Sequence, residues 1–117
     1  GIPDKKVIYR VTRSYYASLV RHGVRIYEYT PGFNHAKQTV ADGRVATVGT
    51  INMDYRSLYH HFENGVLMYG YEAIMDVERD FLETFKKCAE VTEKYRQDKF
   101  TVVTGIDCIL RLFAPLM

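Results

Sequence analysis

The sequence predicts an α/β fold, in which a mixed β-sheet is flanked by helices on its faces. Segments with helical periodicity alternate along the chain with short runs of β-branched and aromatic residues. Two such runs are separated by Asp42-Gly43, a dipeptide typical of a tight hairpin turn. With 117 residues, 47% of them hydrophobic, the chain has enough apolar material for the core of one ordinary domain.

Apolar residues recur at helical spacing in two long stretches. The first runs to about Arg21 and should end before Gly23, and the second extends from Tyr71 to about Arg96. A last apolar segment, residues 102–112, is also predicted to be helical. The buried face of the second helix is predicted to consist of Ile74, Val77, Phe81, Phe85, Cys88 and Thr92.

The remaining segments predict strands and the loops between them. Residues 24–29 and 62–69 are rich in β-formers, and the runs on either side of Asp42-Gly43 form the two strands of a hairpin. Residues 52–58 are polar and irregular, which indicates a loop at the open end of this hairpin. Within that loop, Arg56 and Ser57 are expected to shape the backbone.

The hairpin turn predicts which residues face one another. A two-residue loop at Asp42-Gly43 would pair Lys37 with Val48 and His35 with Thr50. Because side chains alternate between the faces of a strand, four polar side chains should then point from one side of the hairpin near its open end. They are His35, Lys37, Thr50 and Asn52.

Charge and cysteine content exclude several classes of protein. The formal net charge is +2, with 26% charged residues, and gives no sign of a nucleic-acid-binding protein. Cys88 and Cys108 lack C-x-x-C spacing, so we read both as reduced thiols and predict neither a disulfide framework nor a zinc site. The sequence predicts no signal peptide within these residues, and no apolar run reaches the roughly 20 residues that a membrane-spanning helix needs.

The polar residues of the hairpin suit attack on a phosphodiester. The neutral imidazole of His35 is a competent nucleophile, while Lys37, Thr50 and Asn52 could hold the non-bridging oxygens. Glu63, on the next predicted strand, is a candidate for the carboxylate behind the imidazole. His60-His61 do not predict a metal site, because adjacent strand residues point to opposite faces and no third ligand has suitable spacing.

The spacing of these residues, H-x-K-x4-D-x6-G-[ST]-x-N, resembles the HKD motif of the phospholipase D superfamily. Three flanking segments, residues 23–37, 49–69 and 111–117, are similar to the C-terminal HKD domain of bacterial cardiolipin synthases. This resemblance implies that residues 1–100 form a phospholipase D-like catalytic half-domain and that 101–117 form an apolar tail. The six motif positions are His35, Lys37, Asp42, Gly49, Thr50 and Asn52.

The resemblance implies a phosphatidyltransferase that makes cardiolipin from two phosphatidylglycerol molecules through a phosphohistidine. In this family His35 acts as nucleophile or general acid, and Glu63 fixes the tautomer of its ring. Asp42 mainly organises the motif, and Gly49 lets a ligand or a neighbouring strand approach closely. Thr50 stands where Ser is commoner, and keeps the hydroxyl. No cofactor or metal is implied.

A single HKD copy implies a partner. It is expected to be an N-terminal HKD domain of the same enzyme or, as the less favoured alternative, a second copy of this chain related by a two-fold axis. The full-length protein is expected at the bacterial cell membrane, and the fragment itself is expected to be soluble and nearly inactive. The tail could dock on a domain or lie at the membrane interface, and the sequence leaves both open.

Other functions share the same motif. A phosphodiesterase or nuclease working as a homodimer would use one HKD motif from each chain, although the modest charge argues against nucleic acid as a partner. Another transferase of the superfamily, such as a phosphatidylserine synthase, would differ only in the acceptor alcohol. A non-catalytic domain that keeps the motif as architecture is the third alternative.

Overall fold

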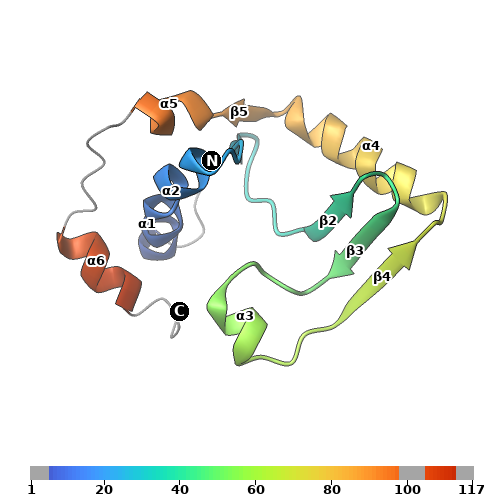
Figure 1. Ribbon diagram of the computed structural model, residues 1–117, viewed down its shortest axis with the longest axis horizontal. Coiled ribbons are helices and arrows are strands. Elements are labelled where there is room, and N and C mark those ends of the chain that lie inside the picture. The colour runs from blue at the N-terminus through green and yellow to red at the C-terminus, as the bar shows by residue number, and fades with distance from the viewer. Residues whose placement is uncertain (1–5, 98–104, 113–117) are drawn as a thin grey trace. The chain divides into compact units, whose positions relative to one another are not determined.

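The computed structural model describes residues 6–97 and 105–112. The chain forms two compact units, one from residues 34–86 and one that joins residues 1–33 to 87–117 (Figure 1). Both units combine helices with an antiparallel sheet, so the predicted α/β class is confirmed. In the described part of the chain, no helix has both the length and the apolar character needed to cross a bilayer. The predicted boundary at residue 100 lies outside the described residues.

The unit of residues 34–86 is a three-stranded antiparallel sheet with a helix packed on one face. Its strands are β2 (Lys37–Ala41), β3 (Val45–Gly49) and β4 (Gly65–Tyr69), with β3 in the centre. Helix α4 (Ala73–Phe85) contacts β2 and β3, and Ile74 of this helix and Ala46 of β3 are completely buried. Short helix α3 (Tyr55–Tyr59) lies in the connection from β3 to β4.

The register of the β2–β3 hairpin differs by one residue from the prediction. Asp42 and Gly43 take the positive φ angles that a tight turn requires, +53° and +60°, and the Arg44 N–H donates to the Ala41 carbonyl. The Arg44 carbonyl, however, accepts from Gly70, next to β4, and Ala41 pairs with Val45. Arg44 is therefore an additional loop residue between the two strands, and it shifts every β2–β3 pair by one residue from the prediction.

Because of this shift, the predicted pairs at the open end are wrong. Lys37 is the first residue of β2 and faces Gly49, the last residue of β3, rather than Val48. His35 and Thr50 lie outside the paired strands. Strand alternation therefore does not place all four polar residues on one face, and their arrangement depends on the segments that follow the strands.

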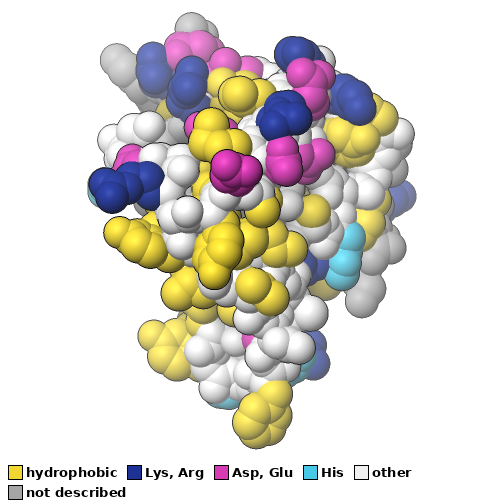
Figure 2. Space-filling model, turned by 90° about the vertical axis from the view of Figure 1, so that its right-hand side faces the viewer, with side chains coloured by type: hydrophobic (Ala, Val, Ile, Leu, Met, Phe, Trp, Pro, Cys, Tyr) yellow, Lys and Arg dark blue, Asp and Glu magenta, His cyan; other side chains and the backbone are white. Residues whose placement is uncertain are grey.

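Strand β4, one of the two edge strands of this sheet, carries exposed apolar side chains. Val66, Leu67 and Tyr69 of β4 are each more than half exposed, as is Met75 of α4. Figure 2 shows hydrophobic side chains gathered across the middle of the side of the molecule on which α4 and the end of β4 are drawn. An exposed apolar patch on an outer strand is typical of a surface that another segment or partner covers.

The second unit is built from helices and a two-stranded sheet. Helix α1 (Lys6–Ser14) contacts both α2 (Tyr16–Arg21) and α6 (Gly105–Leu112). Helix α5 (Thr92–Gln97) contacts α2. Its strands are β1 (Tyr27–Tyr29) and β5 (Cys88–Glu90), which pair antiparallel. Buried side chains from several of these elements form its core: Val11, Val20, Thr92 and Tyr95.

Two predicted helices are shorter in the structure. The first is interrupted at Tyr15, where the Ser14 hydroxyl bonds to a carbonyl of its own helix, but it ends before Gly23 as expected. The second, predicted over residues 71–96, ends at Phe85. Cys88 then pairs with Tyr29 in a strand, so tertiary pairing overrides helix propensity and Cys88 is not on a buried helix face.

The other predicted elements are confirmed in part. Strand 24–29 is present over Tyr27–Tyr29, and strand 62–69 over Gly65–Tyr69. The loop predicted at 52–58 contains α3, and the helix predicted at 102–112 is present as α6 within its described residues. The strands belong to two sheets, and all pairings between described residues are antiparallel, where a single mixed sheet was predicted. The side chain of Cys108 lies outside the described residues.

Candidate functional site

The segment leading into β2 brings an ammonium group to the backbone of His35. The Asn34 side chain accepts from the Ala36 N–H at 2.9 Å and so bends the chain immediately before the strand. Lys37 then reaches back, and its Nζ donates to the His35 carbonyl at 2.8 Å. An ammonium has three donors, so this bond leaves capacity to hold an anion beside His35.

Gly49 allows β3 and β4 to approach closely at the same end of the sheet. A Cβ at this position would lie 2.3 Å from the Asn64 carbonyl oxygen and 2.6 Å from the Gly65 Cα, both backbone atoms that cannot move aside. Gly49 pairs with Gly65 across the strands. The prediction that this glycine admits a neighbouring strand is confirmed.

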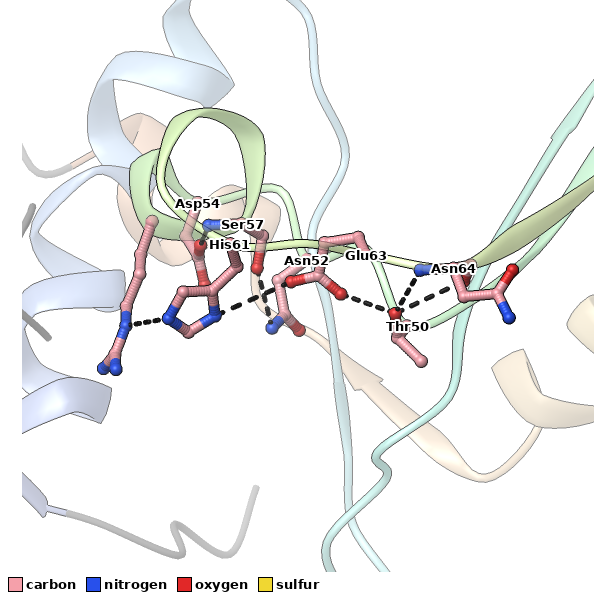
Figure 3. A network of polar contacts seen from close by, with 8 residues as sticks. Thr50, Asn52, Asp54, Ser57, His61, Glu63 and Asn64 are labelled. Carbon is pink, nitrogen blue, oxygen red and sulfur yellow. Dashed lines mark hydrogen bonds and ion pairs between the residues drawn. The ribbon is translucent and has the colours of Figure 1, made fainter.

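Thr50 follows directly and uses its hydroxyl inside the protein. Its Oγ1 donates to Glu63 Oε2 at 2.5 Å and accepts from the Asn64 N–H at 3.0 Å (Figure 3). The Thr50 N–H donates to the Asn64 carbonyl at 2.8 Å. A hydroxyl has a single proton, and two acceptors lie within its reach: Glu63 Oε2 and, at 3.3 Å, the Asn64 carbonyl oxygen. In this arrangement the Thr50 hydroxyl contacts Glu63, and its role in binding phosphoryl oxygens stays a prediction.

Glu63 is held as a carboxylate by these neighbours. The hydrogen bond from Thr50 lowers its pKa most, and a hydrogen bond from Ser57 and the positive charge available on His61 lower it further. His61 Nδ1 lies 3.9 Å from Glu63 Oε1. Glu63 is therefore ionised at neutral pH, as an orienting or charge-stabilising carboxylate must be.

The Asn52 amide is placed by the N-terminus of α3. Its Nδ2 contacts Ser57 Oγ at 3.3 Å, and Ser57 is almost completely buried. The side chain of Asp54 caps the helix by accepting from the Ser57 N–H at 2.7 Å. This cap fixes Ser57, and through it both Asn52 and Glu63. The D-x-x-S pattern before an apolar residue was the available sequence signal for it.

A shallow pocket of about 320 Å³ lies at the open end of the hairpin. Lys37 and Asn52 both line it, together with Thr39, Gly49 and Met53. The pocket therefore joins a cation to an amide donor, which are two of the three groups that the sequence predicted for binding phosphoryl oxygens; the third, Thr50, does not line it.

The structure brings together some of the predicted site residues and not others. Lys37 lies beside His35 and shares the pocket with Asn52, and Thr50 contacts Glu63. Asp42 lies in the turn at the other end of β2, roughly 15 Å of strand away from Lys37. The contact of Glu63 with the His35 ring stays a prediction. The contacts of His61 with Arg56 and Glu63 were not predicted.

Comparison with known proteins agrees with this picture of a phospholipase D-like half-domain. Residues 2–85 match the family described as "Cardiolipin synthase, PLD-like domain", and the chain belongs to this family. No solved structure matches the chain.

Its relatives include proteins named cardiolipin synthase. The chain is 40% identical over 116 residues to the cardiolipin synthase of Geobacillus kaustophilus, covering 98% of this chain and 23% of that protein. It is 40% identical over 119 residues to that of Clostridium perfringens strain SM101, covering 100% and 25%. An uncharacterized protein of Streptococcus mutans is 47% identical over 117 residues, again covering 100% and 25%. The chain thus spans about a quarter of the length of the relatives it matches.

Proposed function

We propose that this chain is one HKD half-domain of a phosphatidyltransferase that joins two phosphatidylglycerol molecules into cardiolipin. The membership of residues 2–85 in the cardiolipin synthase family carries this proposal. The contact of Thr50 with an ionised Glu63, and the pocket shared by Lys37 and Asn52, support it because such groups suit phosphoryl transfer.

In the first step, an imidazole nitrogen of His35, or of its counterpart in a second HKD domain, attacks the phosphorus of phosphatidylglycerol. A P–N bond forms, the P–O bond to glycerol breaks, and the other histidine gives its proton to the leaving oxygen. In the second step, that histidine takes the proton from a hydroxyl of the second phosphatidylglycerol, whose oxygen displaces the histidine from phosphorus. The two steps together release one glycerol.

The roles of the neighbouring side chains follow from their contacts. Lys37 and Asn52 bind the non-bridging oxygens, since both line the pocket. Thr50 positions Glu63, because its hydroxyl lies 2.5 Å from Oε2 of that carboxylate. A carboxylate offers about four lone-pair sites. Glu63 therefore has room to accept from the His35 ring as well, which would fix the tautomer and stabilise the imidazolium.

The second histidine must come from outside these residues. We propose that an N-terminal HKD domain of the same polypeptide supplies it, or else a second copy of the chain. We also propose that the whole protein acts at the bacterial cell membrane, where its lipid substrates lie. The short length matched, about a quarter of each relative, supports the first arrangement.

The test is formation of cardiolipin from phosphatidylglycerol by the whole protein in lipid vesicles. His35→Asn should abolish the product and remove any acid-labile label trapped on the protein from phosphorus-labelled substrate. His22→Asn is the matched control, because His22 bonds to a carbonyl of its own helix α2. Cleavage of a nucleic acid or of a simple diester, with no lipid product, would contradict the proposal and favour a phosphodiesterase.

A further inference from the structure

We propose that His61 is a positioning residue of this site, which holds the Glu63 carboxylate toward Thr50 and is itself held by Arg56. The inference rests on the proposed function, since it assigns a second layer of contacts to the same transferase site. His61 and Arg56 lie outside the motif. His61 approaches Glu63 from the side opposite to Thr50 (Figure 3), and Arg56 bonds to His61.

The contact with Arg56 fixes where the His61 ring carries its proton. Arg56 Nε lies 2.7 Å from His61 Nε2. A guanidinium has donors only and does not lose its proton in proteins, so Nε2 must be the acceptor of this bond. A neutral ring with an unprotonated Nε2 carries its hydrogen on Nδ1. Arg56 therefore selects the Nδ1–H tautomer.

That tautomer places a donor on the Glu63 side. His61 Nδ1 is 3.9 Å from Oε1 of Glu63, while Oε2 of the same carboxylate accepts from Thr50 at 2.5 Å. The longer distance is beyond a direct hydrogen bond but within the range of an ion-dipole contact or of a single bridging water. The carboxylate is thus oriented from both of its oxygens, and loss of the His61 contact would free it to rotate about the bond from Thr50.

The arrangement holds only while His61 is neutral. Protonation puts a hydrogen on Nε2, which faces the donor of Arg56, and so replaces a hydrogen bond with repulsion between two cations. The Glu63 carboxylate, on the other side of the ring, attracts the added charge and would draw the ring away from Arg56. The orientation of Glu63 therefore depends on an unprotonated Nε2 in His61.

The first test uses the 117-residue chain and needs no activity. Nitrogen chemical shifts of the imidazole rings, assigned by substituting each histidine in turn, report which nitrogen of His61 is protonated. In the neutral ring we expect the Nδ1–H form, and Arg56→Met should shift the proton toward Nε2. A ring already protonated on Nε2 in the unsubstituted chain would overturn the inference.

The second test uses the whole protein in the lipid assay. His61→Leu should lower kcat about tenfold with little change in KM, because a small misplacement of a group behind the nucleophile affects the chemical step. His61→Asn should restore most of the rate, since its amide offers a donor near the position of Nδ1–H. His60→Leu, which removes the neighbouring ring beside Tyr55, is the control and should leave kcat within about twofold.

The two tests separate the inference from the function on which it rests. Normal kcat in His61→Leu, in a protein that makes cardiolipin, would overturn the role of His61 and leave the transferase assignment intact. If the tautomer is as expected but no protein makes cardiolipin, the unsubstituted one included, the transferase assignment is refuted. The contact between His61 and Glu63 would then have no role in that reaction. A rate lost in His61→Leu and not recovered in His61→Asn would also overturn the positioning role.

Discussion

The two ends of the β2–β3 hairpin contain residues of the same motif but differ in what determines their structure. At the turn, Asp42 and Gly43 adopt positive φ angles, and the local backbone bond from Arg44 to Ala41 closes the loop. At the open end, the Thr50 side chain is placed by Glu63 and Asn64 from the segment before β4, while Lys37 bonds to the His35 carbonyl two residues back.

The difference shows that some residues of the motif determine the fold, whereas others form the candidate site. A substitution at the turn should change stability and spare the site, because Asp42 lies a strand length from Lys37. A substitution at the open end should disturb both, since Gly49, Thr50 and Glu63 are in contact or adjacent there. The predictions below test this contrast.

The largest effect is expected at Gly49. Gly49→Ala would place a Cβ within 2.3 Å of the Asn64 carbonyl oxygen and 2.6 Å of the Gly65 Cα, so β3 and β4 must separate. We expect the free energy of unfolding to fall by about 3 kcal/mol or more, measured by urea denaturation. The matched control is Gly65→Ala, whose Cβ meets nothing closer than the Ile51 side chain at 3.5 Å. Equal midpoints for the two variants would refute the contact.

Thr50 should change the site with a smaller effect on the fold. Thr50→Val removes the hydroxyl that most strongly lowers the pKa of Glu63, so this pKa should rise toward its ordinary value in a carbon-detected titration. Thr50→Ser keeps the hydroxyl and should leave the pKa unchanged. The sign follows from linkage: a depressed carboxylate pKa adds stability at neutral pH that disappears as pH falls through the folded-state pKa. Thr50→Val should therefore lose less stability on acidification than the unsubstituted chain.

Local sequence patterns predicted the hairpin turn but not its register. Asp42-Gly43 identified the turn because positive φ angles are a local requirement. The one-residue shift depends on Arg44, whose carbonyl bonds to Gly70 after another strand, and no pattern near the turn contains that partner. In the same way, the strand at Cys88 forms only because Tyr29 is available to pair with it.

The sequence predicted which residues belong to the candidate site, because the motif fixes their types and spacing. It did not predict the contacts between residues from different segments of the chain. The spacing predicted Lys37, Thr50 and Asn52 as site residues. It did not predict that the Thr50 hydroxyl would donate to Glu63, or that Arg56 would meet His61. Those contacts depend on helix α3, in a segment that was predicted to be an irregular loop.

The cap of α3 should have an intermediate effect. Asp54→Ala removes the acceptor of the Ser57 N–H and should cost about 1 kcal/mol in unfolding free energy. Because Ser57 also contacts Asn52 and Glu63, the variant should lower transferase activity of the whole protein as well. Asp54→Ser, which can still cap the helix, should recover most of both. Loss of stability with full activity would show that α3 does not position the site.

The smallest effect on the site and on activity is expected at the turn itself. Asp42→Ala puts a residue without a polar side chain at φ +53°, and should cost about 1 kcal/mol in the same denaturation experiment. Asp42→Gly and Asp42→Asn tolerate this conformation and should change stability by less than about 0.5 kcal/mol. All three variants should keep the depressed pKa of Glu63 and, in the whole protein, the rate of cardiolipin formation, because Asp42 lies at the far end of β2. A large loss of rate in Asp42→Asn, with stability unchanged, would instead give this aspartate a chemical role and remove the distinction between the two ends of the hairpin.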